Sequence, residues 1–324
     1  MKRREFLGIL GGAVALPFAA HAQQAGKTWR IGMLETTGEA AKPADITAFR
    51  QALRGLGYVE GQNLNIEYRS ADGRPDRFPA LATELIALKV DLIVTRGTPA
   101  AVAAKNATKT IPIVMAAIGD PLLIVASLGR PGGNITGLSA FVTDLMTKRV
   151  ELIKEIVPGL VRIGALLNIS NASQRDQWKE IEATARKVGV QAQLLDIRKT
   201  SEIGPAFDDA SRQRVNALIV GIDAVTQGNQ QLILDLAMTH RMPAIYASRE
   251  FVDAGGLLTY GVNYPDLYRR AATLVHKIFR GAKPADLPIE QPTKFELVIN
   301  LKAAKAIGLT VSPLMLTRAD EVIE

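Results

Sequence analysis

From residue 29 onward, short apolar runs alternate with longer segments in which apolar residues recur at helical spacing. The short runs are rich in Val, Ile and Leu and predict buried strands, and their alternation with helices predicts βα units around mainly parallel sheets. The first set of predicted strands is at residues 30–35, 64–69, 91–96, 113–117 and 135–140. The second set is at residues 162–168, 191–197, 217–222, 244–247 and 257–262. The pattern therefore predicts an α/β fold.

The two sets of strands repeat each other in order and in sequence. The RIG tripeptide at residues 30–32 recurs at 162–164, and the TIPI segment at 110–113 matches RMPA at 241–244. Spacings of about 130 residues are too long for a solenoid repeat and predict two similar lobes, each on its own sheet. The alternative is a chance likeness, because the openings of strands in α/β proteins often resemble one another.

The end of the chain holds more elements than two complete lobes need. An amphipathic helix is predicted at residues 264–279, and a loop rich in Gly and Pro follows at 281–288. A further strand at 295–300 precedes a helix that begins at Leu301. We expect these elements to be shared between the two lobes.

Such sharing requires the chain to cross from one lobe to the other three times. We expect the crossovers near residues 140–143, 262–265 and 291–294. Lobe 1 would contain residues 28–142 and about 264–290, and lobe 2 residues 143–263 and about 291–324. Several parallel crossovers make a hinge of limited freedom.

The first 22 residues have the form of an export signal. Lys2, Arg3 and Arg4 precede an apolar run at residues 6–20, and the run ends in Ala-His-Ala. The Arg3-Arg4 pair indicates the twin-arginine type. An uncleaved membrane anchor is the alternative, but the run is shorter than the ~20 residues that span a bilayer. We expect cleavage near Ala22 and a periplasmic protein.

Composition narrows the function classes further. The formal charge is +7, spread along the chain without a basic block that would indicate a nucleic-acid surface. The absence of cysteine excludes disulfides, thiol catalysis and cysteine metal sites. We predict no cofactor, no metal site and no nucleic-acid partner, and we expect a monomer.

Polar residues follow the carboxyl ends of the predicted strands, where open α/β sheets bind ligands. The candidate ligand-binding residues at these ends are Thr36, Thr37, Thr98, Asp120, Asn171, Asp223 and Ser248. Aromatic residues near the strand ends or crossovers are candidates for the walls of an apolar pocket, namely Tyr246, Tyr260, Tyr264 and Phe141.

Three of these residues carry a specific chemical expectation. Thr98 and Asp120 each precede a proline, as a capping side chain before the first helical residue does. A helix start binds carboxylates or phosphates through its free N–H groups. Asp223 has no proline behind it and could bind an ammonium group. The alternative is that all three only cap helices.

Catalytic signals are weak. The glycine-rich run at 129–137 precedes a strand and lacks the Lys-Ser/Thr of a phosphate-binding loop. His240 suits a helix C-terminus, His276 lies in an apolar helix face, and no Gly-x-Ser-x-Gly motif is present. We predict no catalytic residues.

Five motifs stand in order along the chain, namely RGLGYVEGQN at 54–63, TPAA at 98–101, IPIV at 111–114, PGGNITG at 131–137 and LVINLKAA at 297–304. Together they resemble the substrate-binding proteins of ABC transporters, in the subfamily that includes tryptophan-binding members. The resemblance implies the type I periplasmic binding protein fold, in which two Rossmann-like lobes with parallel sheets are joined by a three-crossover hinge. It also implies ligand capture by hinge closure, no catalysis, and partnership with a membrane permease and its cytoplasmic ATPase.

The chain departs from the tryptophan binders at two places. The loop after the first strand, at 35–40, lacks their His-Pro pair, and Asp223 is followed by Ala224 where they have Asn. We therefore expect a small anionic or zwitterionic solute, such as an amino acid or a related compound. The alternatives are an exported α/β hydrolase that uses the same cleft and a ligand-sensing protein for a membrane receptor.

Overall fold

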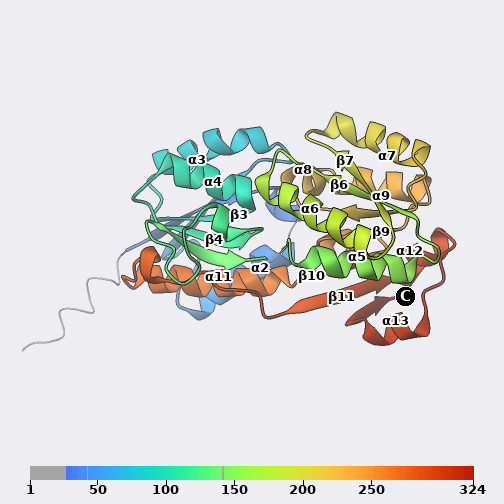
Figure 1. The fold of residues 1–324 in the computed structure, drawn as a ribbon. Coiled ribbons are helices and arrows are strands. Elements are labelled where there is room, and N and C mark those ends of the chain that lie inside the picture. The colour runs from blue at the N-terminus through green and yellow to red at the C-terminus, as the bar shows by residue number, and fades with distance from the viewer. Residues whose placement is uncertain (1–26, 42, 141) are drawn as a thin grey trace, which may run out of the picture.

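The computed structural model describes residues 27–324 apart from positions 42 and 141. The predicted export signal at 1–22 and Phe141 lie outside the described residues. Within them, the apolar runs form two sheets flanked by helices, which lie side by side in Figure 1. The predicted α/β fold with two lobes is confirmed.

The sheet of lobe 1 has five parallel strands in the order β2-β1-β3-β4-β5. They are β1 (Trp29–Glu35), β2 (Leu64–Ser70), β3 (Leu92–Arg96), β4 (Ile113–Ile118) and β5 (Ile135–Ser139). One face is covered by α2 (Pro43–Gly55) and α11 (Tyr264–Phe279), the other by α3 (Phe78–Ala87) and α4 (Thr98–Ala107). Because both faces are covered, every residue of β3 and β4 is buried, and the apolar residues of these strands do not alternate with polar ones.

The sheet of lobe 2 has seven strands in the order β12-β11-β10-β9-β8-β6-β7, and only β10 and β11 pair antiparallel. The strands are β6 (Arg162–Leu167), β7 (Gln191–Asp196), β8 (Ala217–Val220), β9 (Ala244–Tyr246), β10 (Leu258–Val262), β11 (Phe295–Asn300) and β12 (Glu321–Ile323). All eleven predicted strands are present, with ends that differ by two residues or fewer, and β12 is an addition that the pattern does not predict.

Helices cover both faces of this second sheet as well. One face carries α5 (Leu145–Ile156), α6 (Ala172–Lys187), α12 (Leu301–Ala306) and α13 (Pro313–Arg318). The other carries α7 (Ile203–Arg212), α9 (Gln230–Thr239) and α10 (Arg249–Asp253), and the short α8 (Ala224–Gly228) follows β8. Short 3₁₀ turns are η1 (Glu39–Ala41), η2 (Pro75–Arg77), η3 (Pro121–Leu123), η4 (Thr200–Glu202) and η5 (Pro284–Asp286).

The chain passes between the sheets three times, as Figure 1 shows for α5, α11 and β11. After β5 it enters α5 on the second sheet, and after β10 it enters α11 on the first. The third passage starts at Glu290, whose N–H donates to the Gly137 carbonyl at 2.9 Å, and leads into β11. The Asn263 N–H also donates to the Lys294 carbonyl at 3.2 Å, so the second and third passages are hydrogen-bonded together.

Gly137 of β5 provides a test of how tightly the first sheet packs. Its φ is 149°, and a Cβ there would lie 2.3 Å from the carbonyl oxygen of Met115 in β4. We expect Gly137→Ala to lower the free energy of unfolding by about 2–4 kcal/mol, because the backbone of β4 must shift. Urea unfolding measures this, with Gly129→Ala as the control because a Cβ there meets nothing within 4 Å. Equal midpoints for the two variants would contradict the prediction.

Candidate ligand-binding site

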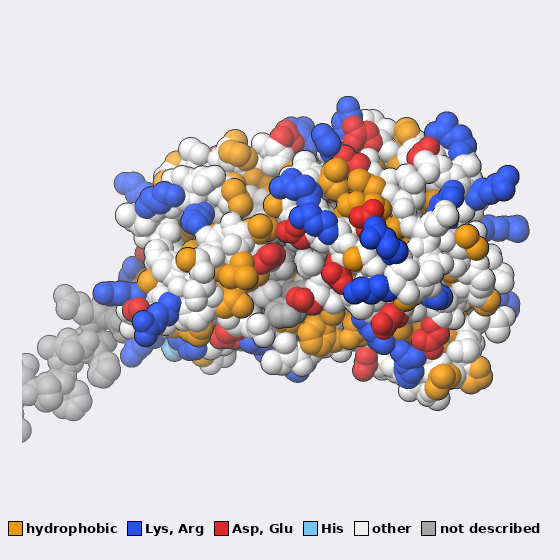
Figure 2. Space-filling model, in the orientation of Figure 1, with side chains coloured by type: hydrophobic (Ala, Val, Ile, Leu, Met, Phe, Trp, Pro, Cys, Tyr) orange, Lys and Arg blue, Asp and Glu red, His pale blue; other side chains and the backbone are white. Residues whose placement is uncertain are grey.

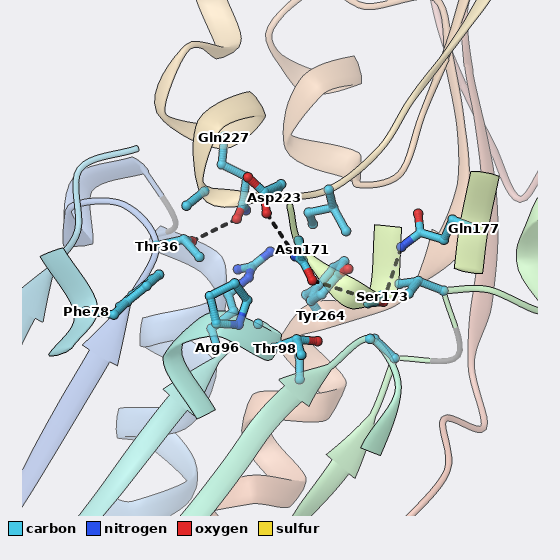
Figure 3. A pocket seen from close by; sticks show the side chains of 18 residues that line it. Thr36, Phe78, Arg96, Thr98, Asn171, Ser173, Gln177, Asp223, Gln227 and Tyr264 are labelled. Carbon is cyan, nitrogen blue, oxygen red and sulfur yellow. Dashed lines mark hydrogen bonds between the residues drawn. The ribbon is translucent and has the colours of Figure 1, made fainter. Parts of the chain in front are cut away.

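A pocket lies between the two sheets, where the carboxyl ends of their strands face each other (Figure 3). It contains about 470 Å³ of space not filled by protein atoms, the solvent at its open mouth included. Lobe 1 supplies residues that follow β1, β3 and β4, and lobe 2 supplies residues that follow β6 and β8. This is the edge at which open α/β sheets bind ligands.

Thr98 forms part of the lobe 1 wall at the start of α4. The sequence predicts Thr98 as the capping residue, but Gly97 occupies that position with φ of 81°, and Thr98 is the first helical residue without a cap hydrogen bond. Its side chain is therefore available to the pocket. Thr98 is 5% exposed, and its Oγ1 has no hydrogen-bond partner among the described residues. A buried hydroxyl beside the free N–H groups of a helix start suits an anionic group.

Arg96, the last residue of β3, adds a buried positive charge to the same wall. It forms an ion pair with Asp45 of α2, and its Nη2 lies 3.5 Å from Glu250 of α10. Its guanidinium carbon lies 4.3 Å from the ring centre of Tyr264, which also lines the pocket. Burial is the largest single effect and lowers the pKa of Arg96, but Asp45 together with Tyr268, Glu250 and Tyr264 outweighs it and holds this pKa well above its usual value. The guanidinium therefore stays charged although it is buried.

Asp223 forms the opposite, lobe 2 wall. It caps α8, because its Oδ1 accepts from the Val225 N–H at 3.0 Å. The same Oδ1 accepts from Asn168 Nδ2 at 3.0 Å, and Oδ2 accepts from Asn171 Nδ2 at 2.9 Å. Asp223 therefore caps a helix and also lines the pocket, so its two predicted roles, as a helix cap and as a ligand-binding residue, are compatible. The two amides fix its carboxylate in place, and Figure 3 shows the hydrogen bond from Asn171 beside the cavity.

The lobes touch each other around the pocket. Thr36 Oγ1, after β1, donates to Gln227 Oε1 of α8 at 2.7 Å. The Arg96–Glu250 ion pair also joins the lobes. At a third point the backbones themselves meet, because a Cβ on Gly228 would lie only 2.5 Å from the Gly73 Cα. The pocket is therefore enclosed by contacts from both sides.

The other predicted site residues lie in different places. Asp120 is half-buried and caps η3 by accepting from the Leu122 N–H at 2.9 Å, outside the pocket lining. Thr37 and Ser248 line a smaller neighbouring cavity. Tyr246 is buried against Phe251 in the core of lobe 2. Tyr260 packs partly buried against the cores of both lobes, away from the pocket lining.

The structure adds residues to the pocket that the sequence analysis misses. Phe78 begins α3, Gln177 lies one turn into α6, and Gln227 lies in α8. Gln177 is 1% exposed, and its Nε2 donates to Ser173 Oγ at 3.3 Å while its Oε1 has no partner among the described residues. A survey limited to strand ends does not reach these positions. Arg96, by contrast, does lie at a strand end. A charged residue directly after four buried strand residues was the sequence signal that could have identified it as a site residue.

The two described histidines lie outside the lining of this pocket. His240 Nδ1 is 2.9 Å from Ser211 Oγ on exposed parts of α7 and α9. His276 Nδ1 is 3.1 Å from the Tyr58 hydroxyl, on the side of lobe 1 that α11 covers. A hydrolase that uses a cleft histidine gains no support from this arrangement.

Comparison with known proteins identifies the family. The model of the family described as ABC transporter substrate binding proteins matches residues 33–323. The chain belongs to this family.

Two relatives with an amino-acid ligand are similar to this substrate-binding protein over most of its length. A "Tyrosine-binding protein" of Clostridioides difficile (strain R20291) is 29% identical over 263 residues, which are 81% of this chain and 75% of the relative. The Streptococcus pneumonia ABC domain, solved in complex with L-Trp, is 29% identical with a TM-score of 0.84, covering 92% of this chain and all of that one.

A third relative allows the arrangement of the two lobes to be compared with that of an open structure. The ligand-free, open structure of a substrate-binding protein with adhesive properties from Clostridium difficile is 27% identical and covers 91% of this chain and 99% of that one. Its TM-score is only 0.64. At nearly equal identity, the L-Trp complex is much more similar. Together with the contacts between the lobes, this indicates a closed arrangement.

The visible face of the molecule carries mixed charge. On the face in Figure 2, Lys and Arg side chains are interspersed with Asp and Glu and form no continuous basic stripe. Among the described residues, no helix has the length and apolar character needed to cross a membrane.

The Gly73–Gly228 contact predicts a variant that closes poorly. Gly228 is the last residue of α8, and its backbone is not in the left-handed region, so an alanine is compatible with the helix there. The added Cβ would contact the Gly73 backbone of lobe 1, and we expect this contact only when the lobes are closed. We expect unchanged thermal stability without ligand and about tenfold weaker ligand binding. Calorimetry measures the affinity, and small-angle X-ray scattering measures the compaction on binding.

The matched control is Gly204→Ala in α7 of the same lobe, where a Cβ meets nothing within 4 Å. We expect this control to bind and compact like the wild type. Equal affinities for the two variants would show that the lobes do not approach this closely at Gly228 during binding.

Proposed function

We propose that this protein is the extracytoplasmic solute-binding component of an ABC importer and that its solute is a small zwitterion of the amino-acid class. The opposite chemistry of the two pocket walls carries the proposal. Lobe 1 presents the start of α4, the Thr98 hydroxyl and the charged Arg96, and lobe 2 presents the Asp223 carboxylate. A ligand with one anionic and one cationic end interacts with both lobes only when they are closed.

The rest of the pocket supports an amino acid with an apolar or aromatic side chain. Phe78, Ile222 and Val142 line it, and burial raises the pKa of the Tyr264 phenol to about 12, so this ring stays neutral. The named ligands of the two relatives, tyrosine and L-Trp, have such side chains. The loop after β1 and Ala224 differ from the tryptophan binders, so we expect a preference among aromatic amino acids that differs from theirs.

The importer role includes the partners and the location expected from the sequence. The periplasmic protein, cleaved near Ala22, acts as a monomer and delivers its ligand to a membrane permease driven by a cytoplasmic ATPase. Membership of the substrate-binding family supports this role, and the predicted export signal supports the location.

The experiment that tests the function is a thermal-shift and calorimetric survey of the twenty L-amino acids. A ligand at 100 times its Kd adds about 2.7 kcal/mol to the stability of the folded state, which raises the melting temperature. We expect at least one aromatic amino acid to bind. We expect tyramine, which lacks the carboxylate, and phenylpropionate, which lacks the ammonium group, to bind at least about 100-fold more weakly. Equal binding by either analogue would disprove recognition of a zwitterion.

A variant of Asp223 tests the cationic end separately. Asn remains a good helix cap, so Asp223→Asn keeps the start of α8 and removes the charge, although it also replaces the oxygen that accepts from Asn171 with an N–H donor. We expect a 10- to 100-fold loss of amino-acid affinity, corresponding to ~1.5–3 kcal/mol for a charged hydrogen bond, with little change in phenylpropionate binding. Asp196→Asn, the same change at the end of β7 and outside the pocket lining, is the control. Unchanged affinity in Asp223→Asn would remove the ammonium role.

A further inference from the structure

A second, smaller cavity lies between the lobes beside the main pocket. It contains about 240 Å³ of space, its opening included, and its lining includes Thr37 of lobe 1 and Ser248 and Gln230 of lobe 2. Gln227 lines both this cavity and the main pocket. Thr37 follows β1 and Ser248 follows β9, so this cavity also lies at the carboxyl ends of the strands.

Two hydroxyl groups in this cavity are buried without a partner. Thr37 is 5% exposed and Ser248 is 2% exposed. Thr37 Oγ1 and Ser248 Oγ form no hydrogen bond among the described residues. Ser248 stands at the cap position of α10 but makes no side-chain cap bond. Most buried hydroxyl groups are hydrogen-bonded, so these two, from opposite lobes, leave hydrogen-bonding capacity at the cavity that a polar group between the lobes could use.

The Gln227 side chain lies between this cavity and the main pocket, and its Oε1 accepts a hydrogen bond from Thr36 Oγ1 at 2.7 Å. The side chain is half-buried and rotates about three single bonds. A different Gln227 rotamer would therefore change the boundary that the two cavities share.

We propose that the smaller cavity is a second subsite of the cleft, which binds a neutral hydroxyl or carboxamide group at the far end of the solute. Hydroxyl and amide side chains line it, and these both donate and accept hydrogen bonds. Glu250 lines it too and is already 3.5 Å from Arg96, so its carboxylate repels an anionic group. This inference rests on the proposed function, because the charged end of the same solute occupies the main pocket.

The test compares two pairs of amino acids that differ mainly in a terminal polar group. L-tyrosine is compared with L-phenylalanine, and L-glutamine with L-methionine, by calorimetry on the wild type and on a Thr37→Val, Ser248→Ala double variant. We expect the wild type to bind the polar member of at least one pair at least about tenfold more tightly. We expect the double variant to reduce that ratio at least about fivefold. Thr83→Val, on the exposed side of α3, is the control that keeps the wild-type ratio.

The melting temperature without ligand supplies a second readout. In the open protein the two hydroxyls face water, so we expect the double variant to melt no lower than the wild type. Ser312→Ala shows the sensitivity of the assay, because the Ser312 hydroxyl caps α13 and its loss lowers stability. A lower melting temperature for the double variant would show that the protein itself uses these hydroxyls, and it would overturn the inference.

The remaining outcomes separate the two proposals. If amino acids bind but the polar-to-apolar ratio is the same in the wild type and the double variant, the cavity holds only water and this inference fails alone. If none of the twenty amino acids binds, the proposed function fails and this inference fails with it.

Discussion

The three passages of the chain between the sheets are the constraint on which the site depends. They fix the two sheets so that the carboxyl ends of β1, β3 and β4 face those of β6 and β8. Parallel strands direct all their following loops to one edge. A lobe alone therefore has half a site, and the passages bring the halves together. Because the second and third passages are hydrogen-bonded to each other at Asn263 and Lys294, the lobes move with limited freedom.

Several buried polar atoms without a hydrogen-bond partner lie where the two lobes meet. The Thr95 and Thr143 hydroxyls also have no partner among the described residues and line neither of the two cavities, whereas the buried Glu35 carboxylate accepts from the Tyr268 hydroxyl. The hydroxyls of Thr37, Thr98 and Ser248 and the amide oxygen of Gln177 have no partner among the described residues, and all four side chains line cavities between the lobes. Unsatisfied polar groups inside a core would cost stability without return. At the surface where the lobes meet, they are the groups that a ligand can satisfy.

The sequence predicts the fold well because apolar runs specify strands locally. It misses β12 because three residues at the sheet edge, Glu321–Ile323, are too few to show a pattern. It predicts Thr98 and Asp223 for the site because strand ends are visible in sequence. It misses Gln177 and Gln227 because helices bring them to the pocket, and the Thr36–Gln227 contact joins residues 191 positions apart. It selects Tyr246, which is in fact core, because a buried aromatic and a pocket aromatic have the same sequence signature.

The same unsatisfied groups bear on the hinge closure that the proposed function requires. In the described arrangement the Thr98 hydroxyl and the Gln177 amide oxygen are buried without a partner among the described residues, and each such group costs about 1–3 kcal/mol where closure removes it from water. Two such groups bias the empty protein toward the open form by more than tenfold, since 1.4 kcal/mol is a factor of ten. A ligand that pairs with both lobes offsets this cost only in the closed form, and so it shifts the population by its differential affinity. The contacts between the lobes, such as Thr36 with Gln227, then hold the arrangement that the ligand has made favourable.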